Sequence, residues 1–165
     1  MNKPEEYPKG KNNDRDSLFK EIKNVFFTYF KGKLTIALIL GALAWGMLWI
    51  LKIPYSGIMG VLIGGLNLIP YIGPLLSAIL VVGTTLILTN LKKALWALAV
   101  VILLQIMDDW ILQPKILGKA FGINPIMIFV LVFVGGLAFG IPGMILAVPI
   151  GAILKIIFKK YKRNL

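Results

Sequence analysis

The sequence predicts an all-α membrane protein, a polytopic helical bundle of about six hydrophobic segments with an N-terminal amphipathic helix. Two of the segments are predicted to be broken or re-entrant hairpins. The chain is 58% hydrophobic and 15% charged, whereas an ordinary globular domain is about 25% charged. Two long stretches, 53–91 and 120–154, carry no charged side chain. The lysines gather at the ends of the apolar stretches, as is typical of membrane proteins.

The formal net charge of +11 arises from 18 basic and 7 acidic residues. On a soluble protein this charge would indicate nucleic-acid binding, but here the lysines flank apolar stretches and form no solvated face. They indicate topology signals and contacts with anionic lipid, so we expect a lipid bilayer as partner and no nucleic acid. Cysteine and histidine are both absent, which excludes disulfides and metal sites built from those side chains. Phosphate-binding loops and catalytic triads are also absent from the sequence, so we expect no enzyme, no cofactor and no metal.

Two polar segments precede the first apolar stretch. Residues 1–17 are charged and almost free of apolar side chains, which predicts a disordered polar tail. Residues 18–33 predict an amphipathic helix at the membrane interface, because apolar side chains recur there at three- and four-residue spacing. The alternative is a polar lead-in of the first span, since Gly32 either breaks the helix or continues it. A transmembrane domain is predicted over 34–158 and a basic cytoplasmic tail over 159–165.

The uncharged stretch 53–91 is too long for a single crossing. As one helix it would be about 58 Å long, whereas a bilayer core is about 30 Å thick. The chain can reverse at 67–74, the sequence Asn-Leu-Ile-Pro-Tyr-Ile-Gly-Pro, because proline interrupts helical hydrogen bonding. The alternative is an ordinary loop between two spans at the membrane surface. We predict that this break contacts substrate or acts as a hinge through Asn67, Pro70, Tyr71, Gly73 and Pro74.

The segment 91–113 predicts a helix that is apolar at first, then polar, and that ends at Pro114. Four polar side chains share one face of this helix: Gln105, Asp108, Asp109 and Gln113. Because a partly buried carboxylate in a membrane can carry a proton or bind a cation, we assign ion or proton coupling to the first three. The alternative is that the acids are solvated at the cytoplasmic end of the helix and paired with Lys115 or Lys119.

The second uncharged stretch, 120–154, is also interrupted. Glycine allows close helix packing in lipid, and glycine and proline are common where helices kink. The alternative is that the glycines only provide tight packing or a contact between copies. We predict a hinge formed by Gly135, Gly136, Gly140, Pro142 and Gly143.

The positions of the lysines predict the orientation of the chain. Cytoplasmic loops carry an excess of Lys and Arg, and the basic residues concentrate before the first span, near 115–119 and in the C-terminal tail. With these regions inside, Lys52 and 92–93 lie outside. We therefore predict a multi-pass protein of the cell membrane with both termini in the cytoplasm.

Four motifs, in order, resemble one known family. They are Ile-Pro-Tyr at 53–55 with the 67–74 motif, Leu-Gln-Pro-Lys-Ile-Leu-Gly at 112–118 followed by Asn-Pro at 124–125, Gly-Gly-Leu-Ala-Phe-Gly-Ile-Pro-Gly-Met at 135–144, and Ala-Val-Pro at 147–149. Over residues 30–158 the chain resembles the C-terminal half of the autoinducer-2 exporter family, also called PerM-like permeases. The resemblance implies a multi-pass permease of the bacterial inner membrane. Members of that family are described as exporters of the signal autoinducer-2 or as sodium(lithium)/proton antiporters.

The residues and the resemblance together predict a transporter for a small polar signal molecule or ion, with a proton or sodium gradient as the candidate driving force. The expected partners are the lipid bilayer, the small polar solute, and either further copies of the chain in a homo-oligomer or a missing N-terminal half. The alternative is a truncated or half-length relative that acts as a non-transporting structural or regulatory membrane subunit.

Labelling from outside the cell tests the predicted orientation. The chain has no cysteine of its own, so Lys52→Cys and Lys119→Cys each carry one reactive thiol. We expect an impermeant maleimide added to intact cells to label position 52 and to leave position 119 unlabelled until the membrane is opened. The reverse pattern would show that the orientation is inverted.

Overall fold

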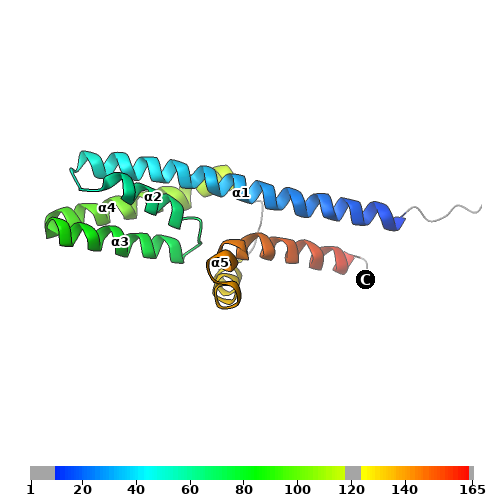
Figure 1. Cartoon of the computed structure of the whole chain (residues 1–165). Helices are drawn as coiled ribbons and strands as arrows, with labels where there is room; N and C mark the ends of the chain where they lie inside the picture. The colour runs from blue at the N-terminus through cyan, green and yellow to red at the C-terminus, as the bar shows by residue number, and fades with distance from the viewer. Residues whose placement is uncertain (1–9, 118–123, 164–165) are drawn as a thin grey trace, which may run out of the picture.

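A computed structural model describes residues 10–117 and 124–163 of the chain. These residues form helices and turns, and no strand occurs among them, so the predicted all-α class is confirmed. The elements in chain order are α1 (Gly10–Ile50), α2 (Ser56–Leu66), α3 (Ile72–Leu88), α4 (Leu91–Met107), the π-helix η1 (Asp108–Leu117) and α5 (Pro125–Arg163), of which Figure 1 labels the α-helices.

The chain is a multi-pass membrane protein by the length and composition of its helices. Among the described residues, three helical stretches are long and apolar enough to cross a bilayer: Phe19–Ile50, Leu91–Leu117 and Ile126–Phe158. The helices α2 and α3 are apolar but shorter, with 11 and 17 residues, and a full crossing takes about 20 residues. The number of crossings, predicted as about six segments, therefore stays a prediction.

The first helix is longer than predicted. α1 runs for 41 residues from Gly10 to Ile50 and passes Gly32 without a break. Residues 10–17, predicted to be disordered, are thus helical here, and the predicted boundary at residue 33 does not interrupt the helix. Extending an existing helix adds one hydrogen bond per residue fixed, and nothing in this polar segment prevents it. The remainder of the predicted tail, residues 1–9, lies outside the described residues.

Small residues bring α2 unusually close to α1. A Cβ atom added to Gly60 would lie 2.6 Å from the carbonyl oxygen of Gly41, and one added to Gly64 would overlap the carbonyl oxygen of Ala37. Interfaces between helices in membranes use such residues because backbone contact replaces the hydrophobic effect as the source of stability. This contact fixes how far along α1 the end of α2 lies.

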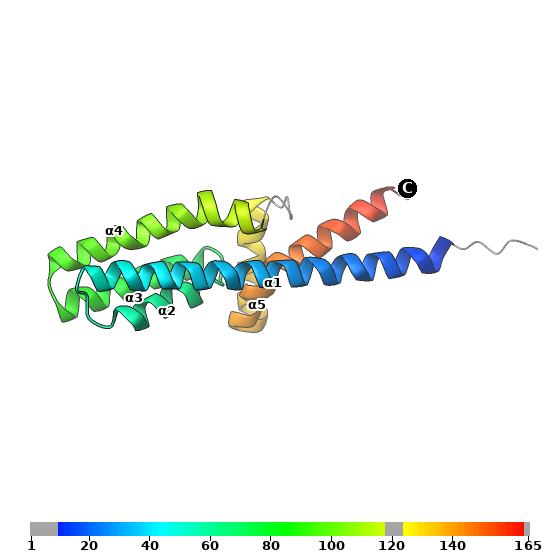
Figure 2. The ribbon, with the colours of Figure 1, turned by 90° about the horizontal axis from the view of Figure 1, so that it is seen from above.

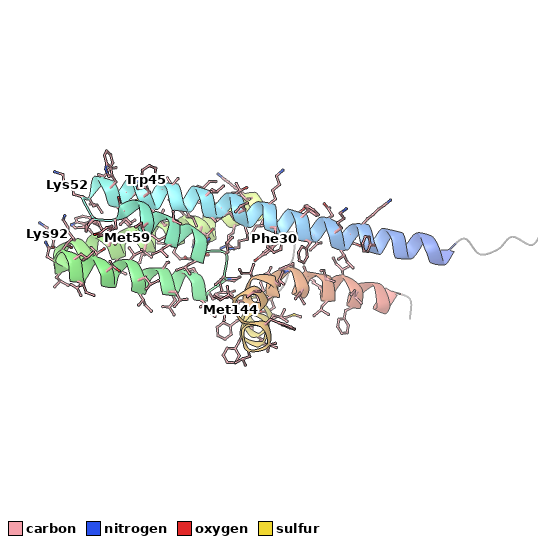
Figure 3. All side chains as sticks on the ribbon, in the orientation of Figure 1. Phe30, Trp45, Lys52, Met59, Lys92 and Met144 are labelled. Atoms are coloured by element: carbon pink, nitrogen blue, oxygen red, sulfur yellow. The ribbon has the colours of Figure 1, made fainter. Side chains whose placement is uncertain are left out.

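The stretch 53–91 forms a hairpin that begins and ends at the same end of the molecule. α2 leads away from that end, the chain reverses at 67–71, and α3 returns (Figure 1). The ammonium of Lys93 donates a hydrogen bond of 2.6 Å to the carbonyl oxygen of Lys52, and Figure 3 shows Lys52 and Lys92 at the same end of the molecule. Buried side chains of α1, α2, α3 and α4 fill the space between the helices, among them Leu48, Met59, Val81 and Val101.

The second broken stretch is also a helical hairpin. α5 bends at Gly140, whose φ of 63° and ψ of −145° are not helical. Close packing of the two halves is visible at Gly143, where an added Cβ would overlap the carbonyl oxygen of Gly135. In Figure 2 the first half runs across the bundle and the second half leads back toward the end where α1 begins. The predicted interruption is therefore where the chain reverses, while its action as a hinge stays a prediction.

Two neighbouring glycines of α2 test the packing on α1. We expect Gly64→Ala to lower the free energy of unfolding by about 1–3 kcal/mol, because the new methyl group meets the backbone of α1. Gly65→Ala is the matched control, since nothing lies within 4 Å of a Cβ at that position. Unfolding in detergent by heat or denaturant measures both. Equal stabilities for the two variants would contradict the close contact.

Candidate functional site

The turn at the tip of the first hairpin has a strained backbone. Tyr71 adopts φ 63° and ψ −51°, and the amide of Ile72 donates a 2.7 Å hydrogen bond to the carbonyl oxygen of Pro70. This pattern is a γ-turn with a positive φ, which is rare and strained for a residue other than glycine. Strain of this kind is concentrated at functional sites, so the tip becomes a candidate site on conformation alone.

Several backbone groups of the tip are hydrogen-bonded within the protein. The amides of Leu68 and Ile69 donate to the carbonyl oxygens of Gly65 and Leu66, at 3.2 and 2.9 Å. The following helix starts so close that a Cβ added to Gly73 would overlap the carbonyl oxygen of Leu66. Interrupted helices are tolerated in lipid only when protein or water satisfies the freed groups, and these hydrogen bonds satisfy a part of them.

Asn67 joins the tip to two other elements. Its side chain is 5% exposed. The amide nitrogen Nδ2 donates to Oδ2 of Asp108 on η1 at 3.0 Å, and the backbone oxygen accepts from Nζ of Lys33 on α1 at 3.4 Å. The residue predicted for substrate contact and the acid predicted for coupling are therefore in direct contact.

Asp108 is a buried acid with one oxygen unused. It is 1% exposed, and Oδ2 accepts a second hydrogen bond from Nε2 of Gln113 at 3.1 Å. Oδ1 is buried and has no hydrogen-bond partner. The solvated alternative is thus wrong for Asp108. It remains open for Asp109, which is exposed and accepts from Gln105 at 3.0 Å and Gln113 at 3.0 Å.

The π-helical turn explains how one amide reaches both acids. A π-helix pairs residue i with i+5, so Gln113 lies over Asp108 as well as over Asp109, and its Nε2 donates to both. Pro114 was predicted to end the helix, and this prediction is wrong, because η1 continues through Pro114 to Leu117. The wider turn makes room for the proline ring, which in an α-helix clashes with the carbonyl four residues earlier.

The cluster of Lys33, Asn67, Asp108 and Gln113 lies far along the helices from the end of the molecule that carries Lys52 and Lys92. At the α-helical rise, Lys33 is about 28 Å along α1 from Lys52, and Asp108 is about 24 Å along α4 from Lys92. A bilayer core is about 30 Å thick. If Lys52 and Lys92 mark one boundary of the hydrophobic core, the cluster would lie close to the other; within the protein, Lys33, Asn67 and Asp108 are buried.

The structure brings only part of the predicted site together. Asn67, Asp108, Asp109 and Gln105 form one connected group, whereas the glycines of the second hairpin lie apart from it. The rings of Tyr71 and Phe129, 6.1 Å between centroids, connect the first tip to α5.

Sequence reasoning missed Lys33 and gave Gln113 no role. Lys33 lies on the same face of α1 as Tyr29, Ile36 and Leu40, which are all buried. Their spacing of three and four residues in the sequence could have predicted that Lys33 is buried too.

Comparison with known proteins adds a family match. The family described as "AI-2E family transporter" matches residues 7–163. The chain is 34% identical over 158 residues to "Putative transport protein YrrI" of Bacillus subtilis (strain 168), covering 94% of this chain and 44% of that relative. It is 34% identical over 128 residues to "AI-2 transport protein TqsA" of Escherichia coli (strain K12), covering 78% and 37%. The chain spans less than half the length of these relatives.

Replacing Asn67 with a carboxylate tests the contact between the tip and the acid. We expect Asn67→Asp to lower the free energy of unfolding by about 2–4 kcal/mol, because a buried donor to Asp108 becomes a second negative charge. Asn90→Asp is the matched control, since Asn90 caps α4 by accepting from the amide of Lys93 and aspartate caps equally well. Denaturation in detergent compares the two, and equal stabilities would contradict the buried contact.

Proposed function

The chain belongs to the AI-2E transporter family, and we propose that it is a membrane permease for a small polar signal molecule or an ion, with Asp108 as its coupling acid. The relatives in this family are named for transport, which supports a permease and no enzymatic role. The chain corresponds to less than half the length of those relatives. The class of solute and the coupling of transport to an ion gradient are therefore proposed from the residues of this chain.

One observation carries the proposal: a buried carboxylate with an unpartnered oxygen beside a broken helix. Ionisable side chains inside membrane proteins are costly and mark ion or substrate paths. Oδ1 of Asp108 is free to accept a proton or to coordinate a cation. Through Asn67, the same carboxylate is bonded to the hairpin tip. A change in the charge of Asp108 therefore changes the strength of a hydrogen bond that the tip makes.

The two hairpins supply candidate moving parts. The strained turn at Tyr71 and the non-helical conformation of Gly140 are places where small backbone changes reorient whole helices. We propose that the first tip contacts the solute through Asn67, Pro70, Tyr71, Gly73 and Pro74. We propose that the second hairpin bends at Gly135, Gly136, Gly140, Pro142 and Gly143.

The outer face of the cluster supports a protein partner. Asp109 is exposed and Gln105 partly exposed, and both belong to Leu91–Leu117, a stretch long and apolar enough to cross a bilayer. An acid on such a stretch needs protein or water beside it. We propose that another copy of the chain, or an N-terminal half like that of the longer relatives, covers this face in the cell membrane, with both termini of this chain in the cytoplasm.

Flux into proteoliposomes tests the proposed function. We expect the chain to move at least one solute of a panel containing autoinducer-2, sodium and protons above the rate of empty vesicles. Asp108→Asn and Asn67→Ala should each lower this flux about tenfold or more, because a charged hydrogen bond contributes about 1.5–3 kcal/mol. Glu21→Gln is the matched control, since Glu21 is an exposed acid on α1.

Two outcomes would count against the proposal. Flux that never exceeds empty vesicles across the whole panel would favour a non-transporting structural or regulatory subunit. Flux that is normal in Asp108→Asn would leave a transporter but remove the coupling role of that acid.

A further inference from the structure

Lys33 does not behave like the other lysines of α1. Lys20, Lys23 and Lys31 are exposed, whereas Lys33 is 5% exposed. A lysine that only marks the membrane boundary extends its ammonium group into the headgroup region. Lys33 instead turns inward, and its Nζ donates to the backbone oxygen of Asn67 at the hairpin tip.

Lys33 and Asp108 bond two different groups of Asn67. One bonds the backbone oxygen of Asn67 at 3.4 Å and the other bonds its side-chain nitrogen at 3.0 Å. Among the described residues no ion pair joins Lys33 to a carboxylate, yet its charge interacts with those of Asp108 and Asp109. Asn67 thus lies between a buried positive and a buried negative charge.

A buried charge without compensation is unstable. Removing one member of a buried pair is strongly destabilising, while replacing both by neutral residues is often tolerated. Asp108 is buried and is bonded to the same residue that Lys33 bonds, whereas Asp109 is exposed. Asp108 is therefore the partner whose charge balances Lys33.

We propose that Lys33 is the built-in counter-cation of Asp108, and that the two charges hold the hairpin tip between them through Asn67. A proton or cation that neutralises Asp108 leaves Lys33 uncompensated and weakens its hold on Asn67. Occupancy of the acid is thereby linked to release of the tip. Lys33 is a positioning residue in this scheme. The pairing of the two charges stands by itself, and its role in transport rests on the proposed function of Asp108 as the coupling acid.

A double-mutant cycle tests the pairing without any transport assay. We expect Lys33→Met and Asp108→Asn each to lower the melting temperature in detergent by roughly 5–15 °C, since each leaves one buried charge alone. The double variant should melt within about 5 °C of the unmodified chain. Lys33→Arg, which keeps the charge, should restore most of the loss seen in Lys33→Met. Lys31→Met, an exposed lysine two residues away, should combine additively with Asp108→Asn.

Spin labels at Leu34→Cys and Leu75→Cys, both on exposed side chains, give a second readout. The distance distribution between them should broaden in Lys33→Met and narrow again in Lys33→Arg. Additive melting temperatures in the cycle, or an unchanged distribution in Lys33→Met, would overturn the proposal even if flux is normal. Conversely, absent flux with a coupled cycle would reject the proposed function and keep the pairing.

Discussion

The hydrogen bond between Asn67 and Asp108 is the contact on which the candidate site depends. The packing of α1, α2 and α4 has to bring these two residues together. It connects the tip of the first hairpin to the π-helical end of the second long helical stretch, Leu91–Leu117. Gly60 and Gly64 let α2 lie against the backbone of α1, and Asn67 at the end of α2 is then within reach of Lys33. A bulkier α2 would carry the tip away from the acid.

The π-helix η1 serves the same cluster. Its wider turn accommodates Pro114 and places Gln113 over two acids at once. An α-helix with the same residues would hold Gln113 over Asp109 alone. Buried polar groups stabilise a structure only when the network is nearly complete, and Oδ1 of Asp108 is the one buried side-chain atom of this cluster with no hydrogen-bond partner among the described residues. This unused acceptor could bind a proton or a cation, which is why the cluster is a candidate functional site.

The two hairpins differ in what surrounds them. The first packs through α2 on α1 and through α3 on α4, and its tip is hydrogen-bonded to α1 and η1. The second exposes large apolar side chains at its bend, including Leu137, Phe139 and Ile141, and contacts the first mainly through the rings of Tyr71 and Phe129. Such an apolar surface suits lipid or a neighbouring protein, in keeping with relatives more than twice as long as this chain.

The sequence by itself determined the helical membrane class, the two interrupted stretches and the polar face of the acids, because hydropathy, proline and periodicity are local properties. It also predicted that Lys52 and 92–93 share one end, since the stretch between them is too long for one crossing. The contact of Lys33 with Asn67, the burial of Asp108, the bond from Asn67 to Asp108 and the π-helix depended on tertiary structure. Each requires helices distant in sequence to meet at one depth, and no local pattern specifies that depth.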